Sequence, residues 1–426
     1  MARWVQKGHV MKHLLSNTIL LSTFLIAGCA ASQTLGTKES TQSNHFWENP
    51  NVDYVVGMST DGNDNLSLRD VPVLEKALLD TSPVDRKDGL SVGALGIDGG
   101  NKDMILKLAE EIAEGQHEKI DSLLITHKGK LLFESYFARG RINLTHPQAS
   151  ATKTYTGLAL GRAIQLGYLN MTDLDKPVIS FLKNLDPTKF VKGTERVTLR
   201  KAMTMRSGIR ITGEKGDELR KHRDQLKGQE LVQAIFEQSD PITPETQPLS
   251  YGHYSTSLVM QVIEAVVPGT ANEFIKDELF GKMGITTYSW PIGMGGLPSP
   301  GAGASITSRD MVKFGSLAMN KGKWNGEQLI PEVFISEATS RMITAGDAEV
   351  FGGGKDISNQ GYGYFWWNAD MKYGGKSYFS ASAQGGGGQF IILIEELDLM
   401  VVTTGHERHP STLQITAERI LPAFIP

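Results

Sequence analysis

The sequence predicts an α+β fold: an antiparallel sheet flanked by helices, with a mostly helical subdomain inserted at about residues 170–300. Two observations lead to this class. Strand-like runs lie in the first and last thirds of the chain, and the stretch between them has helical periodicity. Strands at both ends with helices between them indicate one sheet that both chain ends build. We expect its strands at residues 122–126, 131–137, 364–367, 389–394 and 399–404.

Apolar residues spaced three or four apart predict the helices. The first, residues 104–113, places Ile105, Leu108 and Ile112 on one face. Residues 213–228 are densely charged and are expected to form a solvated surface segment. Further helices are expected at residues 150–166, 174–185, 199–205, 231–238, 256–267, 273–281, 311–320 and 331–338.

Composition and charge are those of an ordinary globular protein. Of the 426 residues, 40% are hydrophobic and 21% are charged, so the chain can bury a large core. The 43 basic and 47 acidic residues give a net charge of −4, which excludes the basic footprint of a nucleic-acid-binding protein. Nucleic acid is therefore not an expected partner.

The N-terminal segment predicts export. Residues 1–28 read as a signal peptide, a basic stretch followed by a short apolar run, and residues 25–29 resemble the lipobox of bacterial lipoproteins. Cys29 would then carry the lipid, residues 29–45 would form a flexible tether, and residues 46–426 would form the folded domain at the periplasmic face of a membrane. The alternative is a cleaved secretory signal with an incidental cysteine. Met1 and Met11 both remain possible starts.

Ser150-Ala151-Thr152-Lys153 is the stretch most suited to chemistry. It opens a helix of small and apolar residues, and positions i and i+3 lie on the same helix face. A serine becomes a good nucleophile when a base removes its proton, and burial favours the neutral amine that can act as that base. The alternative is a chance Ser-x-x-Lys pair on a wet helix face.

Two other stretches could complete such a site. Tyr251 joins a proline-rich loop to an apolar helix, where a phenol could relay a proton, although a tyrosine at such a junction more often packs. Gly385–Gly388 precede a strand, and their N–H groups could stabilise an oxyanion; the alternative is a flexible loop without a partner. Of the adjacent Trp366 and Trp367, we expect one in the core and the other, taken as Trp366, at a cleft wall.

Several other chemistries find no support. The chain has no Gly-x-Ser-x-Gly elbow and no His-Glu-x-x-His motif, and Gly375-Lys376-Ser377 lacks the first glycine of a P-loop because Asp370 stands there. Cys29 is the only cysteine, and the ten histidines show no metal-ligand spacing. We therefore expect neither a metal nor a cofactor.

In their joint order, these motifs resemble the serine β-lactamase and penicillin-binding-protein superfamily. The resemblance is nearest to the class C β-lactamase-like branch with carboxylesterases and 6-aminohexanoate-dimer hydrolases, and it runs from about Asp121 to Thr404. The stretches that carry it are residues 150–153 with their helix, 199–208, 251–253, 301–315 and 385–389. The resemblance implies a β-lactamase-like fold and a serine hydrolase.

The resemblance also implies roles. Ser150 would be the acylated nucleophile, Lys153 its base and Tyr251 a partner in proton transfer, with the oxyanion held by the backbone N–H groups of Ser150 and Gly386. His253, Gln384, Gly385 and Trp366 would contact substrate.

Two departures from the family pattern bear on the substrate. His253 stands where β-lactamases usually have asparagine, and Ala383-Gln384-Gly385 replaces Lys-Thr-Gly, which removes the cation that holds a carboxylate. This favours an esterase or amidase. The alternatives are a true β-lactamase or D-alanyl carboxypeptidase, and a non-catalytic, lipid-anchored binding protein. The natural substrate, the oligomeric state and the choice of inner or outer membrane stay open.

Overall fold

The computed structural model describes residues 71–117, 119–222, 225–345, 353–407 and 410–425. The predicted signal peptide at residues 1–28, the lipidation site Cys29 and the tether at residues 29–45 lie outside the described residues. Among the helices that the structure describes, none combines the length and apolar character needed to cross a bilayer.

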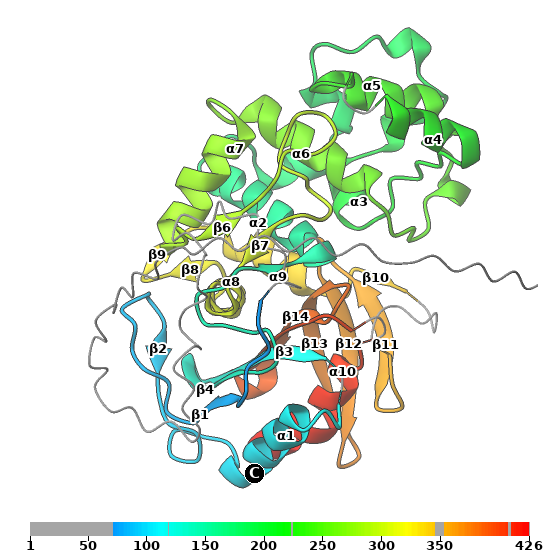
Figure 1. Ribbon diagram of the computed structural model, residues 1–426. Helices are drawn as coiled ribbons and strands as arrows, with labels where there is room; N and C mark the ends of the chain where they lie inside the picture. Colours follow the sequence, from blue (N-terminus) through cyan, green and yellow to red (C-terminus); the bar gives the residue numbers. More distant parts are fainter. Residues whose placement is uncertain (1–70, 118, 223–224, 346–352, 408–409, 426) are drawn as a thin grey trace, which may run out of the picture. The chain divides into compact units, whose positions relative to one another are not determined.

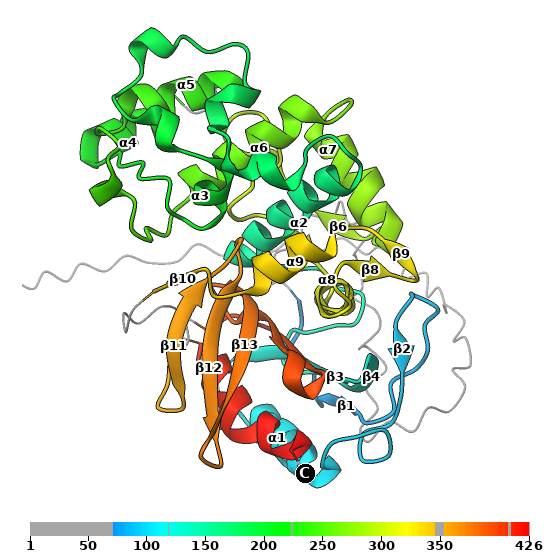
Figure 2. The same cartoon turned by 180° about the vertical axis from the view of Figure 1, so that it is seen from behind.

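The main sheet of the described residues is built from both ends of the chain (Figures 1 and 2), and this confirms the predicted class. Its strand order is β1-β4-β3-β15-β14-β13-β12-β11-β10, with antiparallel neighbours throughout this path, and β2 (Ser91–Val92) adds a short parallel pairing to β4. The two halves meet where β15 pairs with β3, Val401 opposite Ile125. The strands are β1 (Leu78–Asp80), β3 (Ile120–His127), β4 (Lys130–Tyr136), β10 (Ile343–Thr344), β11 (Ile357–Tyr362), β12 (Trp367–Tyr373), β13 (Lys376–Gly385), β14 (Gln389–Ile394) and β15 (Leu399–Gly405).

The strand expected at residues 364–367 is wrong. Gly363 donates its N–H to the carbonyl of Trp366 at 2.8 Å and Phe365 has a φ of 59°, so the chain turns here and β12 begins only at Trp367. Strand β13 was missed for a different reason. Its sequence, Lys376 to Gly385, is rich in serine, alanine and glycine, which have weak strand preference, although both of its edges are paired.

Helices cover both faces of the sheet. One face packs against α1 (Lys102–Ala113) and the C-terminal helical segments, including α10 (Thr412–Ile415), through Phe390 and Ile392 among others (Figures 1 and 2). The opposite face packs against α2 (Thr152–Gln165) and α8 (Ser308–Met319). The predicted inward face of the first helix is confirmed, because Ile105, Leu108 and Ile112 are buried.

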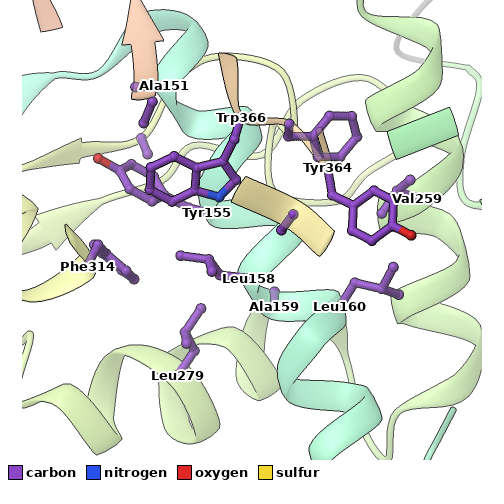
Figure 3. Packing of buried hydrophobic residues seen from close by; sticks show 14 of the residues in the cluster. Ala151, Tyr155, Leu158, Ala159, Leu160, Val259, Leu279, Phe314, Tyr364 and Trp366 are labelled. Carbon is purple, nitrogen blue, oxygen red and sulfur yellow. The ribbon is translucent and has the colours of Figure 1, made fainter. Parts of the chain in front are cut away.

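Helix α2 lies in the centre of the core, as its unbroken apolar sequence predicts. All its residues except Gln165 are buried. Tyr155 and Leu158 pack with Phe314 and Trp366 (Figure 3). Such a location deprives polar side chains on α2 of water, which matters for Lys153 near its start.

The inserted region is helical, with some departures from expectation. Residues 174–185 form short 3₁₀ turns instead of one helix, because Pro177 interrupts them, and residues 275–280 form a π-helical segment. The charged stretch contains an exposed helix, α4 (Gly213–Lys221). The remaining helices are α3 (Leu199–Met203), α5 (Gln229–Gln238), α6 (Tyr254–Val266), α7 (Ala271–Phe274) and α9 (Glu332–Thr339); the small strand pairs are β5 (His146–Pro147) with β7 (Ser305–Ile306), β6 (Tyr288–Ser289) with β7, and β8 (Lys323–Trp324) with β9 (Glu327–Gln328).

Candidate active site

Ser150 lies in a single 3₁₀ turn, Ala149–Ala151, that leads directly into α2. The segment before it is held by β5 and by the N–H of Gln148, which donates to the carbonyl of Ala304 at 2.8 Å. Ala149 has a φ of 46°, a left-handed conformation that costs a non-glycine residue on the order of 1 kcal/mol. The surrounding bonds hold this strained turn, and the half-buried Ser150 stands at the mouth of the helix.

Lys153 lies one helical turn beyond the serine. Its Nζ is 3.0 Å from Ser150 Oγ and donates to the carbonyl oxygen of Gly301 at 2.7 Å. The side chain is only 1% exposed, and burial lowers the pKa of Lys153 from 10.5 to about 8. Among the described residues, no acidic side chain forms an ion pair with it to oppose this shift.

Tyr251 reaches the same place from the loop before α6. The Nζ of Lys153 lies 4.8 Å from the centre of its ring, and its hydroxyl is hydrogen-bonded to the side chains of Ser150 and Trp367. Burial raises the pKa of Tyr251 to about 12, and the two hydrogen bonds oppose that rise. The structure thus brings together the three side chains that sequence reasoning selected: Ser150, Lys153 and Tyr251.

The two pKa values indicate which group is the better base. At pH 7 about a tenth of Lys153 amines would be neutral, whereas only about one in 10⁵ Tyr251 phenols would be ionised. A neutral Lys153 that donates to Gly301 keeps its lone pair for the proton of Ser150. By this comparison Lys153 is the better base of the two groups.

The glycine loop lies beside the turn that carries Ser150. A side chain at Gly385 would come within 2.1 Å of the carbonyl oxygen of Gln148 and 3.2 Å of the nitrogen of Ala151, so only glycine fits there. Gly386 is exposed, with open space around its α-carbon. The end of β13 therefore stands against the start of α2, and the next backbone N–H group belongs to an accessible residue.

His253 lies at the edge of this group. Its exposed side chain contacts the backbone at Gly301, since a Cβ there would lie 2.7 Å from His253 Nδ1. Desolvation and the charge of Lys153 lower the pKa of His253. Its contact with substrate stays a prediction.

Gln384 and Trp366 differ from their predicted positions. Gln384 lies opposite Phe390 in the sheet, on the face of β13 that packs toward α1 and away from α2. Its side-chain amide donates to Ser382 Oγ at 2.8 Å. Trp366 is 1% exposed and packs in the core around α2 (Figure 3). Trp366 is therefore a packing residue and not a cleft wall.

Sequence reasoning missed two groups. One is Trp367, 3% exposed, whose ring centroid lies 5.1 Å from that of Tyr251. Side chains alternate between the two faces of a strand, but this pattern does not predict which of two adjacent tryptophans contacts a loop from a distant part of the chain. The other is the carbonyl of Gly301, which carries no side-chain signature; its segment runs beside α2, where Thr156 Oγ1 donates to the carbonyl of Pro300 at 3.0 Å.

In the part of the chain that the structure describes, no group of three or more histidine, cysteine, aspartate or glutamate side chains is placed to hold a metal ion. The chemistry that the described site offers is that of a hydroxyl, an amine of lowered pKa and a phenol.

An antiparallel sheet flanked by helices, with a helical insertion, defines the β-lactamase-like class of fold. Residues 107–423 match the β-lactamase family model, and the chain belongs to that family. The resemblance seen in the sequence is thereby confirmed. Proteins of this family are generally serine hydrolases acting on amide or ester bonds.

Solved structures share the fold at low sequence identity. A Bacillus anthracis protein provisionally described as a 6-aminohexanoate-dimer hydrolase aligns over 79% of this chain and 84% of its own, with a TM-score of 0.54 and 18% identity. A class C β-lactamase covers 76% and 96%, with a TM-score of 0.55 and 13% identity. A D-stereospecific amidohydrolase from a Streptomyces species covers 73% and 97%, with a TM-score of 0.52 and 16% identity. No curated protein matches the chain in sequence.

Proposed function

We propose that this protein is a serine hydrolase that cleaves ester or amide bonds through an acyl-enzyme on Ser150. The observation that carries the proposal is the 3.0 Å contact between Ser150 Oγ and the buried Nζ of Lys153, whose pKa is lowered to about 8. A nearby neutral amine is what a serine alcohol needs to become a nucleophile at neutral pH.

The reaction proceeds in two halves. Lys153 takes the proton of Ser150 while Oγ attacks the substrate carbonyl carbon, and the N–H groups of Ser150 and Gly386 stabilise the oxyanion. As the bond to the leaving group breaks, Tyr251 gives its proton to the leaving alcohol or amine, and the protonated Lys153 then gives its proton to Tyr251, which restores both groups. Water then attacks the acyl-enzyme in the same way, releasing the acid and restoring Ser150.

The substrate acyl group that the site favours carries no carboxylate next to the scissile bond. Ala383 and Gln384 stand where β-lactamases have lysine and threonine, so β13 offers no cation at that place. An anionic group left without a partner in a partly buried site binds poorly. This argues for an esterase or amidase of neutral substrates over a β-lactamase or D-alanyl carboxypeptidase.

A substrate panel tests the proposal. The purified protein should hydrolyse nitrophenyl esters or short linear amides, and Ser150→Ala should lower the rate on the order of a thousandfold or more. Efficient turnover of penicillins or cephalosporins would replace the esterase assignment by β-lactamase. Absence of all turnover, with no labelling of Ser150 by a fluorophosphonate, would leave a non-catalytic binding protein of this fold.

We further propose that the protein is exported and held at a bacterial membrane by a lipid on Cys29. The support is the sequence of residues 1–29. Labelling of cells with a fatty-acid analogue should mark the wild type and not Cys29→Ser. Equal labelling of both would contradict the anchor, and release of both into the soluble fraction would favour a cleaved secretory signal.

A further inference from the structure

Asp121, outside the group of side chains described above, is a buried carboxylate with two histidine partners. It follows the first residue of β3 and is 0% exposed. Its Oδ2 atom lies 3.1 Å from His146 Nε2 and 2.8 Å from His406 Nδ1, and its Oδ1 accepts the backbone N–H of Arg139 at 3.2 Å. One carboxylate oxygen therefore joins two rings that are 260 positions apart in the chain.

The two histidines belong to segments on either side of the candidate site. His146 is in β5 and precedes Ser150 by four positions. His406 precedes Glu407, whose N–H donates to the carbonyl of Gly387 at 2.9 Å in the glycine loop. The carboxylate thus connects the segment that ends in the N–H of Ser150 with the segment that borders the N–H of Gly386.

Contacts with His146 and His406 stabilise the ionised form of the buried carboxylate. Both ring nitrogens of His146 face oxygen acceptors, since Nδ1 lies 3.3 Å from the carbonyl of Pro147 and Nε2 faces Asp121. Burial alone would raise the pKa of Asp121, but its bonds and charges with His146 and His406 hold it below the usual value.

Other charged groups do not take over this role. Arg141 is close enough for its charge to interact with Asp121, but its guanidinium donates to the backbone carbonyls of Gly140 and Pro72, at 2.8 and 2.7 Å. Arg139 contributes its backbone N–H to the carboxylate. The side-chain bonds to Asp121 that the structure gives are thus those of the two histidines.

We infer that Asp121 is a positioning residue that sets the spacing between the two backbone N–H donors of the oxyanion site by clamping His146 and His406 to one oxygen. The inference rests on the proposed function. An oxyanion site depends on donors held within a few tenths of an ångström, so loosening either segment slows acylation more than it weakens ground-state binding.

Three variants test the clamp: Asp121→Asn removes the charge at constant shape, His406→Gln loosens only the partly exposed arm, and Glu134→Gln is the matched control. Glu134 is also a buried β-strand carboxylate in a hydrogen-bonded ion pair, with Arg309 at 2.6 Å, and its other side-chain partner in the described part of the chain, Tyr136, lies outside the candidate site. Each protein is measured by hydrogen–deuterium exchange of residues 146–150 and 385–388, and by kcat and KM for an ester that the wild type cleaves.

We expect Asp121→Asn to raise exchange in both segments and to lower kcat about tenfold to a hundredfold, with KM changed less than about threefold. His406→Gln should raise exchange in residues 385–388 alone, with a smaller loss of kcat. Glu134→Gln should change neither segment. Unchanged exchange in Asp121→Asn, or the same changes in Glu134→Gln, would overturn the clamp. If the variants change exchange as expected but the wild-type protein shows no hydrolase activity, the clamp is supported and the proposed function is rejected.

Discussion

The carbonyl oxygen of Gly301 accepts a hydrogen bond from Lys153 Nζ at 2.7 Å, and this bond directs the amine. A neutral amine has one lone pair, and with one N–H committed to Gly301 that pair can face Ser150 Oγ, 3.0 Å away. The contact joins the start of α2 to a segment 148 positions later, and it explains how a lysine can be both buried and oriented. Four predictions follow from this geometry and from its neighbours.

The first concerns the pH dependence of hydrolysis. Because the base must be neutral and burial lowers the pKa of Lys153 to about 8, kcat/KM should rise with pH and level off above about pH 8. Below that point the logarithm of kcat/KM should rise with pH with a slope of about one, as for a single titrating base. Initial rates from pH 5 to 10 with a neutral ester measure the profile, and a flat profile across pH 7 to 9 would mean that Lys153 is not the base.

The second concerns the stability cost of the same lysine. Folding lowers the pKa of Lys153 from 10.5 to about 8. Below pH 8 the buried charge therefore lowers the free energy of unfolding by about 3 kcal/mol. This loss disappears as the pH rises from 8 toward 10.5, where the unfolded lysine also becomes neutral. Lys153→Met should therefore abolish most activity and raise the free energy of unfolding at pH 7.

Urea unfolding of wild type and Lys153→Met at pH 7 and pH 10 checks the sign. The variant should exceed the wild type in free energy of unfolding by more at pH 7 than at pH 10, because only the wild type carries a buried charge at the lower pH. A variant that is less stable than wild type at both values would show that the bonds to Ser150 and Gly301 outweigh the desolvation of the amine.

The third prediction concerns Trp367. An indole N–H can only donate, so in its bond to Tyr251 the phenol oxygen is the acceptor, and this bond helps to position the phenol beside Ser150. Trp367→Phe keeps an aromatic ring and removes this donor, and kcat should fall about fivefold, as for the loss of one neutral hydrogen bond. Trp324→Phe, a buried tryptophan in the β8–β9 hairpin, is the control and should leave kcat unchanged. Equal effects of the two substitutions would assign Trp367 to packing alone.

The sequence predicted the helices well and the sheet only in part. Helix α2 has an unbroken run of small and apolar residues, α6 and α8 have helical periodicity, and all three helices lie where these patterns place them. Strand β13 escaped because small residues carry little strand preference, although pairing on both edges makes it a central strand. Local preference could not reveal a strand that exists through its neighbours.

In the candidate site too, local features could be predicted from the sequence and contacts between distant segments could not. Ser150 and Lys153 are one helical turn apart, so their proximity is local and could be read from the sequence. Tyr251 could be selected because its loop joins an apolar helix. The carbonyl of Gly301, the indole of Trp367 and the carboxylate of Asp121 act through contacts between distant segments, and no spacing in the sequence encodes them.

The fourth prediction is the most direct test of the central claim. A chromogenic ester should be mixed with the protein, quenched with acid within the first turnovers, and the peptides analysed by mass spectrometry. We expect the mass of the acyl group on the peptide that contains Ser150, and none in Ser150→Ala. Ester turnover at the full rate with no acyl group on Ser150, or with the group on another residue, would contradict the account.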